Sequence, residues 1–338
     1  MIQQALGTVL DGRDLGREEA REAMGSIMAG DATPAQIGGF LVALRAKGET
    51  PDEIAGFAEA IRGQVLEVRP KRDDLVDTAG TGGDGQATIN ISTAAALVAA
   101  AGGAAVAKHG NRAVSSASGS ADVLEALGFT LEAPPERIAR SIDELGFGFL
   151  FAPAHHPGFR HAAPVRKELA TRTVFNVLGP LTNPAGARAQ IVGVYDSALV
   201  RTIAEVLTRL GARRAFVVHG AFGIDELSPA GPNQVCEVVD GEVRDRVVDP
   251  LDLGIERCAP DELRGGSPEE NASVIRDVFS GRERGAKRDA ILLNAAGAIA
   301  AGGHADDLHD GLEVARAAVD SGAAAERLEA LIAFSWNG

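Results

Sequence analysis

The sequence predicts an α/β protein in which a small N-terminal all-helical domain precedes a larger α/β domain with a mostly parallel central sheet flanked by helices. Three observations support this prediction. Two capped amphipathic helices lie before residue 69, a polar segment follows them, and from residue 75 short β-like runs alternate with longer helical patterns. A length of 338 residues suits two domains, which we expect at residues 1–69 and 70–338.

Two helices of the N-terminal domain are marked by their first residues. Thr33-Pro34 and Thr50-Pro51 each place an N-cap residue before a proline at the first helical position. The apolar residues that follow have the i, i+3, i+4, i+7 spacing of one helix face: Ile37, Phe40, Leu41 and Leu44, then Ile54, Phe57, Ala58 and Ile61. An earlier helix is expected over residues 16–28.

A polar, proline-containing segment, residues 67–74, is predicted to be the hinge between the domains. The β-like runs that follow it are Leu75–Thr78, Ala104–Ala107, Gln190–Tyr195 and Ala215–His219. Residues 234–249 have the pattern of antiparallel strands, and the chain from Ser267 onward has that of several alanine-rich helices.

Composition and charge argue against several classes of protein. The net charge of −14, with no basic stripe of useful length, argues against nucleic acid as a partner. The longest apolar run, residues 94–107, is too short to span a membrane, and no signal-peptide pattern begins the chain. Cys236 and Cys258 lack the spacing of a metal or redox motif. We therefore expect a cytoplasmic protein with reduced thiols and no membrane partner.

A glycine-rich loop follows the first predicted strand. Gly80-x-Gly82-x-x-Gly85 matches the dinucleotide-binding fingerprint, but nothing acidic occurs between Asp84 and Asp122 to hold the ribose hydroxyls. A P-loop is absent as well. The backbone amides of such a loop can still form a nest for phosphate groups.

Two further segments carry groups that suit anions. Asn90, Ser92 and Thr93 stand where a helix begins, so they either cap that helix or offer hydroxyls and free amides to a ligand. The run from Lys108 to Arg112 ends the next predicted strand, at the sheet edge where α/β proteins bind ligands. A solvated basic turn is the alternative for this run. Both strands would deliver phosphate-binding groups to one edge, which favours a small phosphorylated ligand.

Adjacent carboxylates follow the predicted strand 215–219. Asp225 and Glu226 are either solvated loop acids or ligands of a magnesium ion that also touches substrate phosphates. His155 and His156 have no acidic or cysteine partner at metal-ligand spacing, so we interpret them as structural residues.

With these motifs assembled, the chain resembles the anthranilate phosphoribosyltransferase family, whose fold is of the nucleoside phosphorylase type. The resemblance spans nearly the whole chain. The segments that carry it are residues 35–50, 80–84, 90–93, 108–112, 151–169, 175–184 and 225–226. The departures are Phe222, before the acidic pair, and Gly158-Phe159. They leave open the mobility of the metal loop and the shape of the aromatic entrance.

The resemblance implies transfer of the 5-phosphoribosyl group from phosphoribosyl pyrophosphate (PRPP) to the amine of anthranilate, in tryptophan biosynthesis. It also implies two Mg²⁺ per subunit, a homodimer formed by the helical domain, and anthranilate held between the domains. Helices near residues 163–185 would join the helical domain.

The resemblance assigns roles residue by residue. Catalysis would involve Lys108, His109 and Asn111. PRPP would contact Gly80, Gly83, Asp84, Thr88, Asn90, Ile91, Ser92, Thr93, Lys108, His109, Gly110, Asn111, Arg112, Ala113, Val114, Ser115, Ser116 and Ser120. Anthranilate would contact Gly80, Asn111 and Arg166, and magnesium would bind Ser92, Asp225 and Glu226.

The chemistry of such a transfer agrees with the motifs. Charge develops on the departing pyrophosphate, and amides, hydroxyls, Lys108 and magnesium can stabilise it. An aromatic amine is neutral at pH 7, so no strong general base is required. His109 either relays a proton or positions its neighbours. Arg166 suits a carboxylate because its guanidinium donates two hydrogen bonds in one plane, and a surface ion pair is the alternative.

Two other functions remain open at this point. A pyrimidine-nucleoside phosphorylase shares the architecture and a similar Lys-His-Gly-Asn segment, but it would take inorganic phosphate and a nucleoside. A non-catalytic paralogue that binds nucleic acid would need a basic surface, which the net charge of −14 opposes.

Overall fold

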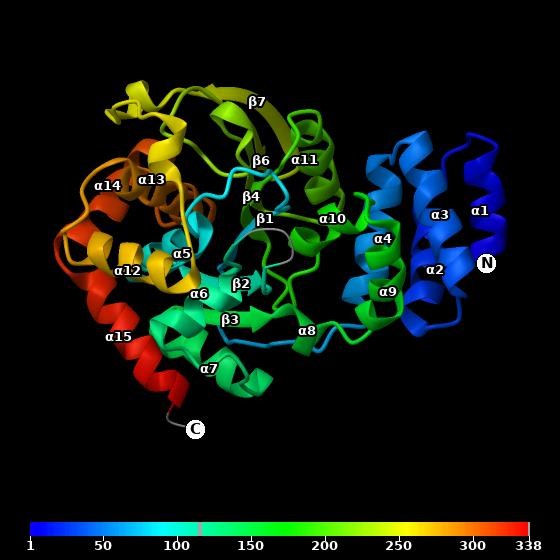
Figure 1. The fold of residues 1–338 in the computed structure, drawn as a ribbon, viewed down its shortest axis with the longest axis horizontal. Helices are drawn as coiled ribbons and strands as arrows, with labels where there is room; N and C mark the ends of the chain where they lie inside the picture. Colours follow the sequence, from blue (N-terminus) through cyan, green and yellow to red (C-terminus); the bar gives the residue numbers. More distant parts are fainter. Residues whose placement is uncertain (114–116, 337–338) are drawn as a thin grey trace.

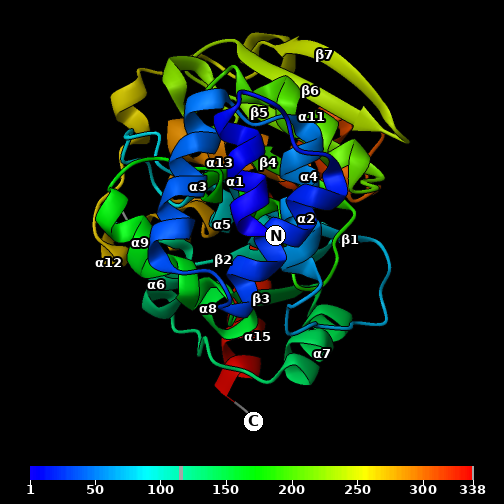
Figure 2. The same ribbon diagram turned by 90° about the vertical axis from the view of Figure 1, so that its right-hand side faces the viewer.

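The computed structural model describes residues 1–113 and 117–336. A helical bundle occupies one end of the molecule, and a larger α/β part with the C-terminus forms the rest (Figure 1). In the view from the bundle side, helices α1 to α4 lie in front of the sheet (Figure 2). None of the helices in the described ranges is long and apolar enough to cross a membrane.

Four helices build the N-terminal bundle: α1 (Ile2–Leu10), α2 (Arg17–Ala29), α3 (Pro34–Lys47) and α4 (Pro51–Arg62). Both predicted starts are confirmed, because the hydroxyls of Thr33 and Thr50 accept the amides of Gln36 and Glu53, each at 3.3 Å. Helix α1 was not predicted, since Met1 provides no capping side chain. The rings of Phe40 and Phe57 meet edge to face at 6.0 Å in the bundle core.

The sheet has seven strands in the order β3-β2-β1-β4-β5-β6-β7. The strands are β1 (Leu75–Gly80), β2 (Ala105–Gly110), β3 (Phe147–Phe151), β4 (Ala189–Gly193), β5 (Arg214–His219), β6 (Asn233–Val239) and β7 (Glu242–Val248). Strands β1 to β5 pair in parallel, and β6 and β7 are antiparallel, as predicted. The sequence did not predict β3, whose short continuous apolar run has no alternation to distinguish it from a buried helix.

The remaining helices cover the sheet and connect it to the bundle. They are α5 (Ile91–Ala101), α6 (Ser120–Leu127), α7 (Pro135–Leu145), α8 (Ala152–His155), α9 (Phe159–Leu169), α10 (Phe175–Leu178), α11 (Leu199–Arg209), α12 (Pro268–Phe279), α13 (Ala286–Ala301), α14 (Leu308–Asp320) and α15 (Ala323–Trp336). Short 3₁₀ helices are η1 (Gly179–Leu181), η2 (Ala221–Gly223), η3 (Pro250–Leu253) and η4 (Pro260–Leu263). The helices predicted after Ser267 are thus confirmed.

Two large cores lie on opposite faces of the sheet. One packs α5 and α12 to α15 against one face. The other joins the N-terminal bundle to α9, α10 and α11 and to side chains of β4, β5 and β6, among them Val192, Val217 and Val238. The apolar interior of the bundle therefore continues into the α/β part, and α9 packs on α2 and α3. The boundary at residue 69 stays a prediction.

Candidate active site

The candidate site lies where the parallel strands end. Gly80 of β1 pairs with Gly193 of β4, and Gly110 of β2 pairs with Phe151 of β3. Strand β5 ends at His219, and the segment after it carries the acidic pair. Because the carboxyl ends of parallel strands share one edge, the three predicted segments reach the same region.

The glycine loop, residues 80–88, lies directly against the acidic pair. Gly82, Gly83 and Gly85 have φ of 66°, 74° and 76°, which side chains disfavour. The amide of Gly82 donates to Asp225 Oδ2 at 2.7 Å. A Cβ on Gly80 would lie 2.4 Å from that same oxygen, and one on Gly193 would lie 1.5 Å from the backbone oxygen of Asp225. The missing side chains let the acidic segment cross the strand ends.

Three carboxylates crowd together at this crossing. Asp225 and Glu226 are half-buried, and the amide of Asp225 lies 3.4 Å from Asp84 Oδ2. Burial raises the pKa of Asp225 to about 7, and the charge of Asp84 adds to the rise. Burial and then Asp225 raise the pKa of Glu226 to about 8, against the charge of Lys108. Solvated loop acids would not behave in this way.

The donor set fits a magnesium ion that binds together with its substrate. Across residues 1–113 and 117–336, no group of three or more His, Cys, Asp or Glu side chains could hold a metal by itself. Mg²⁺ characteristically takes one or two carboxylates and completes its shell with water and substrate phosphates. A crowded acidic pair beside a phosphate-type loop meets that requirement. Phe222, the departure noted in the sequence, is 64% exposed, and its carbonyl accepts from Gln86 Nε2 at 3.0 Å.

Lys108 is buried between the first two strands. Its side chain is 1% exposed, and Nζ donates to the carbonyl of Thr78 at 2.6 Å and lies 3.4 Å from Ser92 Oγ. Burial lowers the pKa of Lys108, and Asp77 and Glu226 oppose this. The amide of Ser92 donates to Glu226 Oε1 at 3.1 Å. The structure thus brings Lys108, Ser92 and Glu226 together, and the alternative of a solvated basic turn is wrong for Lys108.

Asn90 stands at the N-cap of α5, but its side chain makes no capping hydrogen bond. Its Nδ2 donates to the carbonyl of Ser118 at 3.0 Å, and its Oδ1 accepts from Ser118 Oγ and Asn271 Nδ2, both at 2.9 Å. Ile91 and Thr93 are buried, so α5 offers a ligand mainly its backbone at these positions. Thr88 pairs with Arg264 in an isolated β-bridge. The side chain of Asn90 therefore holds Ser118, and its contact with PRPP stays a prediction.

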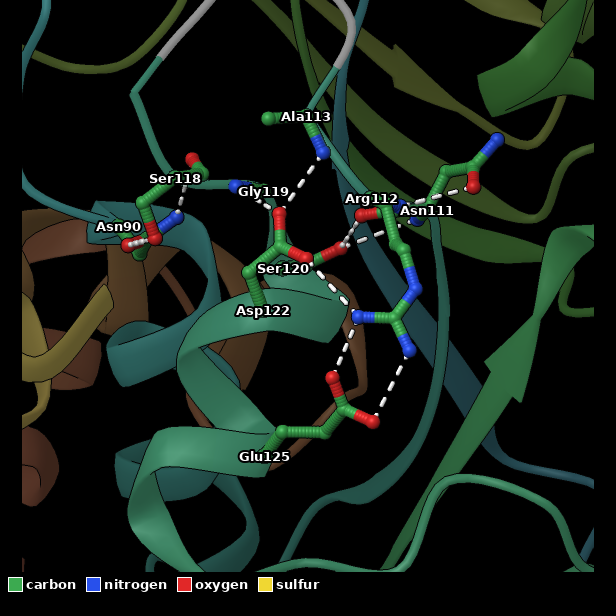
Figure 3. Close-up of polar contacts among 9 residues, drawn as sticks. All are labelled: Asn90, Asn111, Arg112, Ala113, Ser118, Gly119, Ser120, Asp122 and Glu125. Atoms are coloured by element: carbon green, nitrogen blue, oxygen red, sulfur yellow. Dashed lines mark hydrogen bonds and ion pairs between the residues drawn. The ribbon is translucent and has the colours of Figure 1, made fainter. Parts of the chain in front are cut away.

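Residues 111–113 and 119, on either side of the gap in the described residues, contact the start of α6 (Figure 3). Ser120 Oγ accepts the amide of Asn111 at 3.1 Å, and Asp122 Oδ2 accepts the amide of Ala113 at 2.9 Å. The Arg112 guanidinium pairs with Glu125 and Asp122 (Figure 3), and its contact with PRPP stays a prediction. The predicted contacts Val114, Ser115 and Ser116 lie outside the described residues.

His109 has both ring nitrogens occupied. Nδ1 lies 3.1 Å from the carbonyl of Gly179, so it carries the proton and donates, and Nε2 lies 3.1 Å from His156 Nε2. The second contact requires the His156 N–H to donate to a neutral His109. Burial lowers the pKa of His109 to about 3 and that of His156 to about 4. The prediction of His109 as a proton relay does not fit this geometry. A positioning role does, and His156 is structural, as interpreted from the sequence.

The neutral pair predicts a pH dependence of stability. The unfolded chain binds protons on both imidazoles below about pH 6.5, whereas the folded chain does not, so the free energy of unfolding should fall as the pH drops. Each histidine contributes up to about 1.4 kcal/mol per pH unit between pH 6.5 and 4. His109→Asn keeps a donor for Gly179 but cannot titrate. Urea unfolding at about pH 7 and about pH 5 should show a smaller loss for the variant; equal losses contradict a neutral pair.

Arg166 reaches the region from α9 without an acidic partner. Its guanidinium lies over the ring of Phe175, 5.1 Å from the centroid, and within the described ranges it forms no ion pair or hydrogen bond. Burial lowers the pKa of Arg166. The alternative of a surface ion pair is therefore wrong. Ring contacts run from Phe175 to Phe159 at 5.7 Å, to His156 at 5.2 Å and to His109 at 4.9 Å, which connects α9 to the end of β2.

Asp77, which was not predicted from the sequence, holds residues at the same edge of the sheet in place. Asp77 is fully buried in β1, and its carboxylate accepts the amide of His109 at 3.0 Å and Asn183 Nδ2 at 2.7 Å. Burial raises its pKa to about 6. A lone carboxylate inside an apolar strand was the available signal, since such a group needs buried donors.

The chain is similar to known proteins in both sequence and fold. A family model described as "Glycosyl transferase family, helical bundle domain" matches residues 3–64, and one described as "Glycosyl transferase family, a/b domain" matches residues 72–325. The chain is 53% identical to the anthranilate phosphoribosyltransferase of Myxococcus xanthus (strain DK1622) over 98% of each chain.

Solved structures agree with these matches. The anthranilate phosphoribosyltransferase from Thermus thermophilus superposes with a TM-score of 0.94 at 50% identity, covering 98% of this chain and 99% of that one. The enzyme from Saccharomyces cerevisiae, solved in complex with PRPP and Mg, gives a TM-score of 0.90 at 29% identity over 100% and 98% of the two chains.

Proposed function

The chain belongs to the anthranilate phosphoribosyltransferase family, and we propose that it transfers the 5-phosphoribosyl group of PRPP to the amine of anthranilate. The products are N-(5-phosphoribosyl)anthranilate and pyrophosphate, in tryptophan biosynthesis. One observation carries the proposal: the carboxylates of Asp225 and Glu226 lie within hydrogen-bond distance of the amides of Gly82 and Ser92. This arrangement joins a metal-type acidic pair to both loops suited to a diphosphate.

The donor half of the site stabilises the leaving group. Other amides of the glycine loop and of the start of α5, with the Lys108 ammonium, would donate to the charge that grows on pyrophosphate. Asp225 and Glu226, with the Ser92 hydroxyl, would hold Mg²⁺, which supplies Lewis-acid stabilisation of phosphate oxygens when bound. The yeast relative solved with PRPP and Mg supports this use of magnesium, and we propose two ions per subunit.

The acceptor half of the site positions anthranilate. Arg166 has its planar donors free and packs on an aromatic ring, which suits an aromatic carboxylate. The amine needs orientation rather than deprotonation, in agreement with a His109 whose ring nitrogens both contact protein. Asn111, at the end of β2, is proposed to orient the amine.

Replacing Arg166 by Ala should mainly weaken the capture of anthranilate. Loss of a charge-assisted pair of hydrogen bonds should raise the KM for anthranilate about 10- to 100-fold and leave the KM for PRPP nearly unchanged. Arg166→Lys should recover part of the loss, since lysine keeps the charge without the planar geometry. Lys167→Ala, an exposed neighbour on the same helix, is the matched control. An unchanged KM for anthranilate would remove Arg166 from the acceptor site.

The loss of anthranilate fluorescence tests the function directly. Protein, Mg²⁺, PRPP and anthranilate are mixed, and we expect a decay that requires all four. No decay with folded protein would overturn the proposal. Phosphorolysis of uridine or thymidine would indicate the nucleoside phosphorylase alternative. Salt-sensitive binding of single-stranded DNA in a filter assay would indicate the non-catalytic one.

We further propose a homodimer formed by the helical bundle and a cytoplasmic location. Met1, Leu10 and Val42 are exposed apolar side chains of the bundle, at 71%, 69% and 46% exposure, and they suit burial against a second copy. Light scattering should give a mass twice that of one chain. Cys236 and Cys258 are unpaired thiols, which suits a reducing compartment. Fractionation of cells should recover the protein with cytoplasmic markers.

A further inference from the structure

One arginine outside the groups assigned above contacts the backbone of the glycine loop. Arg172, in the segment between α9 and α10, donates from its guanidinium to the carbonyl of Gly83. The same guanidinium lies over the ring of Tyr195, 4.0 Å from the centroid. Tyr195 follows β4, and its amide donates to Thr81 Oγ1 at 3.0 Å. Arg172 and Tyr195 therefore contact the glycine loop from two sides.

The pair is tied to the rest of the protein on its outer side. The backbone carbonyl of Arg172 accepts a hydrogen bond from Arg45 of α3. The half-buried ring of Tyr195 packs against the core that the bundle shares with α9 and α11. Arg45 of the bundle and the shared core thus support the two residues on the side away from the glycine loop.

Gly82 and Gly83 are conformationally permissive, so the loop needs an outside contact to fix the orientation of its peptide groups. Gly82 and Gly83 both have positive φ, and a loop of this kind can rotate its peptide groups at little cost. In a planar trans peptide the C=O of one residue and the N–H of the next point in opposite directions. Because Arg172 holds the Gly83 carbonyl, the N–H of Asp84 points away from Arg172. A nest binds an anion only when its amides keep such orientations.

We propose that Arg172 and Tyr195 form a clasp that positions the glycine loop for the diphosphate of PRPP. The clasp rests on the proposed function, since it acts on the loop assigned to the diphosphate. Arg172 is a positioning residue, acting through the Gly83–Asp84 peptide. Tyr195 holds the guanidinium by its ring face, so its hydroxyl is not required.

The chain offers a spectroscopic probe of the clasp. It contains one tyrosine, Tyr195, and one tryptophan, Trp336, which lies in the C-terminal helix and is 68% exposed. In the Trp336→Phe variant, Tyr195 is therefore the only side chain that fluoresces more strongly than phenylalanine. In this background we titrate PRPP in the presence of Mg²⁺ and record tyrosine fluorescence. We expect a saturable change, because binding at the loop alters the environment of the stacked ring.

Arg172→Ala in the same background should abolish the change and raise the KM for PRPP about tenfold, since a stacking contact and a charge-assisted hydrogen bond are lost. The KM for anthranilate should stay within about twofold, because the bond from Arg45 uses the backbone of Arg172. Arg172→Lys should restore part of the affinity, since lysine keeps the charge but not the planar donors.

The matched control is the substitution of Arg188 by Ala. Arg188 is exposed, and its Nε donates to the carbonyl of Gly211 at 3.0 Å, at the opposite end of β4. Arg188→Ala removes a similar contact away from the loop and should change neither fluorescence nor kinetics. If PRPP binds Arg172→Ala as tightly as the parent, the clasp is wrong while the function stands. If the parent itself fails to bind PRPP, the function is overturned and the clasp with it.

Discussion

The double variant Asp225→Asn, Glu226→Gln is expected to lower kcat/KM by about 10³-fold or more while the protein stays folded. The two carboxylates are the best candidates for holding Mg²⁺, and a metal contributes several kcal/mol of transition-state stabilisation in such reactions. The amides are isosteric and can still accept the amides of Gly82 and Ser92. Steady-state rates over a range of magnesium concentrations measure the effect.

The same double variant should lose no thermal stability, although it loses activity. Crowding of like charges with Asp84 helps to raise the pKa values of both acids, and neutral side chains remove that repulsion. We therefore expect the melting temperature without metal to be unchanged or higher. Asp261→Asn with Glu262→Gln, an exposed pair, makes the same two substitutions away from the site and serves as the control. Full magnesium-dependent activity in the Asp225, Glu226 variant would exclude these residues as ligands.

Replacing Gly193 by Ala is expected to damage both stability and activity. The new Cβ would lie 1.5 Å from the backbone oxygen of Asp225, and Gly193 is held between β1 and β5. Neither backbone can yield easily, so the segment with the acidic pair must move. Overpacking of this kind costs about 1–3 kcal/mol or more, which lowers the melting temperature by several degrees in a protein of this size. We expect a loss of activity of about 10²-fold or more from the displaced carboxylates.

The control for this substitution is Gly25→Ala in α2. A Cβ at Gly25 meets nothing within 4 Å, and alanine favours a helix by about 1 kcal/mol over glycine. This variant should be at least as stable as the wild type and fully active. Thermal unfolding and kcat/KM of both variants make the comparison. Normal values for Gly193→Ala would show that the close approach between β4 and the acidic segment does not exist in solution.

The parts of the fold that sequence could predict are those fixed by local chemistry. The starts of α3 and α4 could be predicted from Thr33 and Thr50, because the cap and the following proline involve only residues within the first turn of each helix. The runs that became β1, β2, β4 and β5 have flanking turn signals. Strand β3 and helix α1 lack such signals, since the first is a plain apolar run and the second begins without a capping side chain.

Some features of the candidate site could likewise be predicted from the sequence, and others could not. Glycine spacing, Lys108 and the pair Asp225-Glu226 are visible in the sequence because each is unusual in its own surroundings. The contacts of Arg112 with Glu125, of His109 with His156 and of Arg172 with Gly83 depend on residues that only the tertiary fold brings together. Its place after a parallel strand and the family resemblance made Arg112 a predicted phosphate ligand. The position of α6 gave it a carboxylate partner.

The core that runs from the bundle into β4, β5 and β6 also bears on how such a chain can change over generations. Helices α1 to α4 are contiguous in sequence, yet they share their apolar interior with α10 and α11, far along the chain. A cut after residue 64 would leave apolar side chains of both fragments in water. The bundle is therefore poorly suited to exchange between relatives by recombination, and substitutions in α11 and α4 are expected to accumulate as matched pairs.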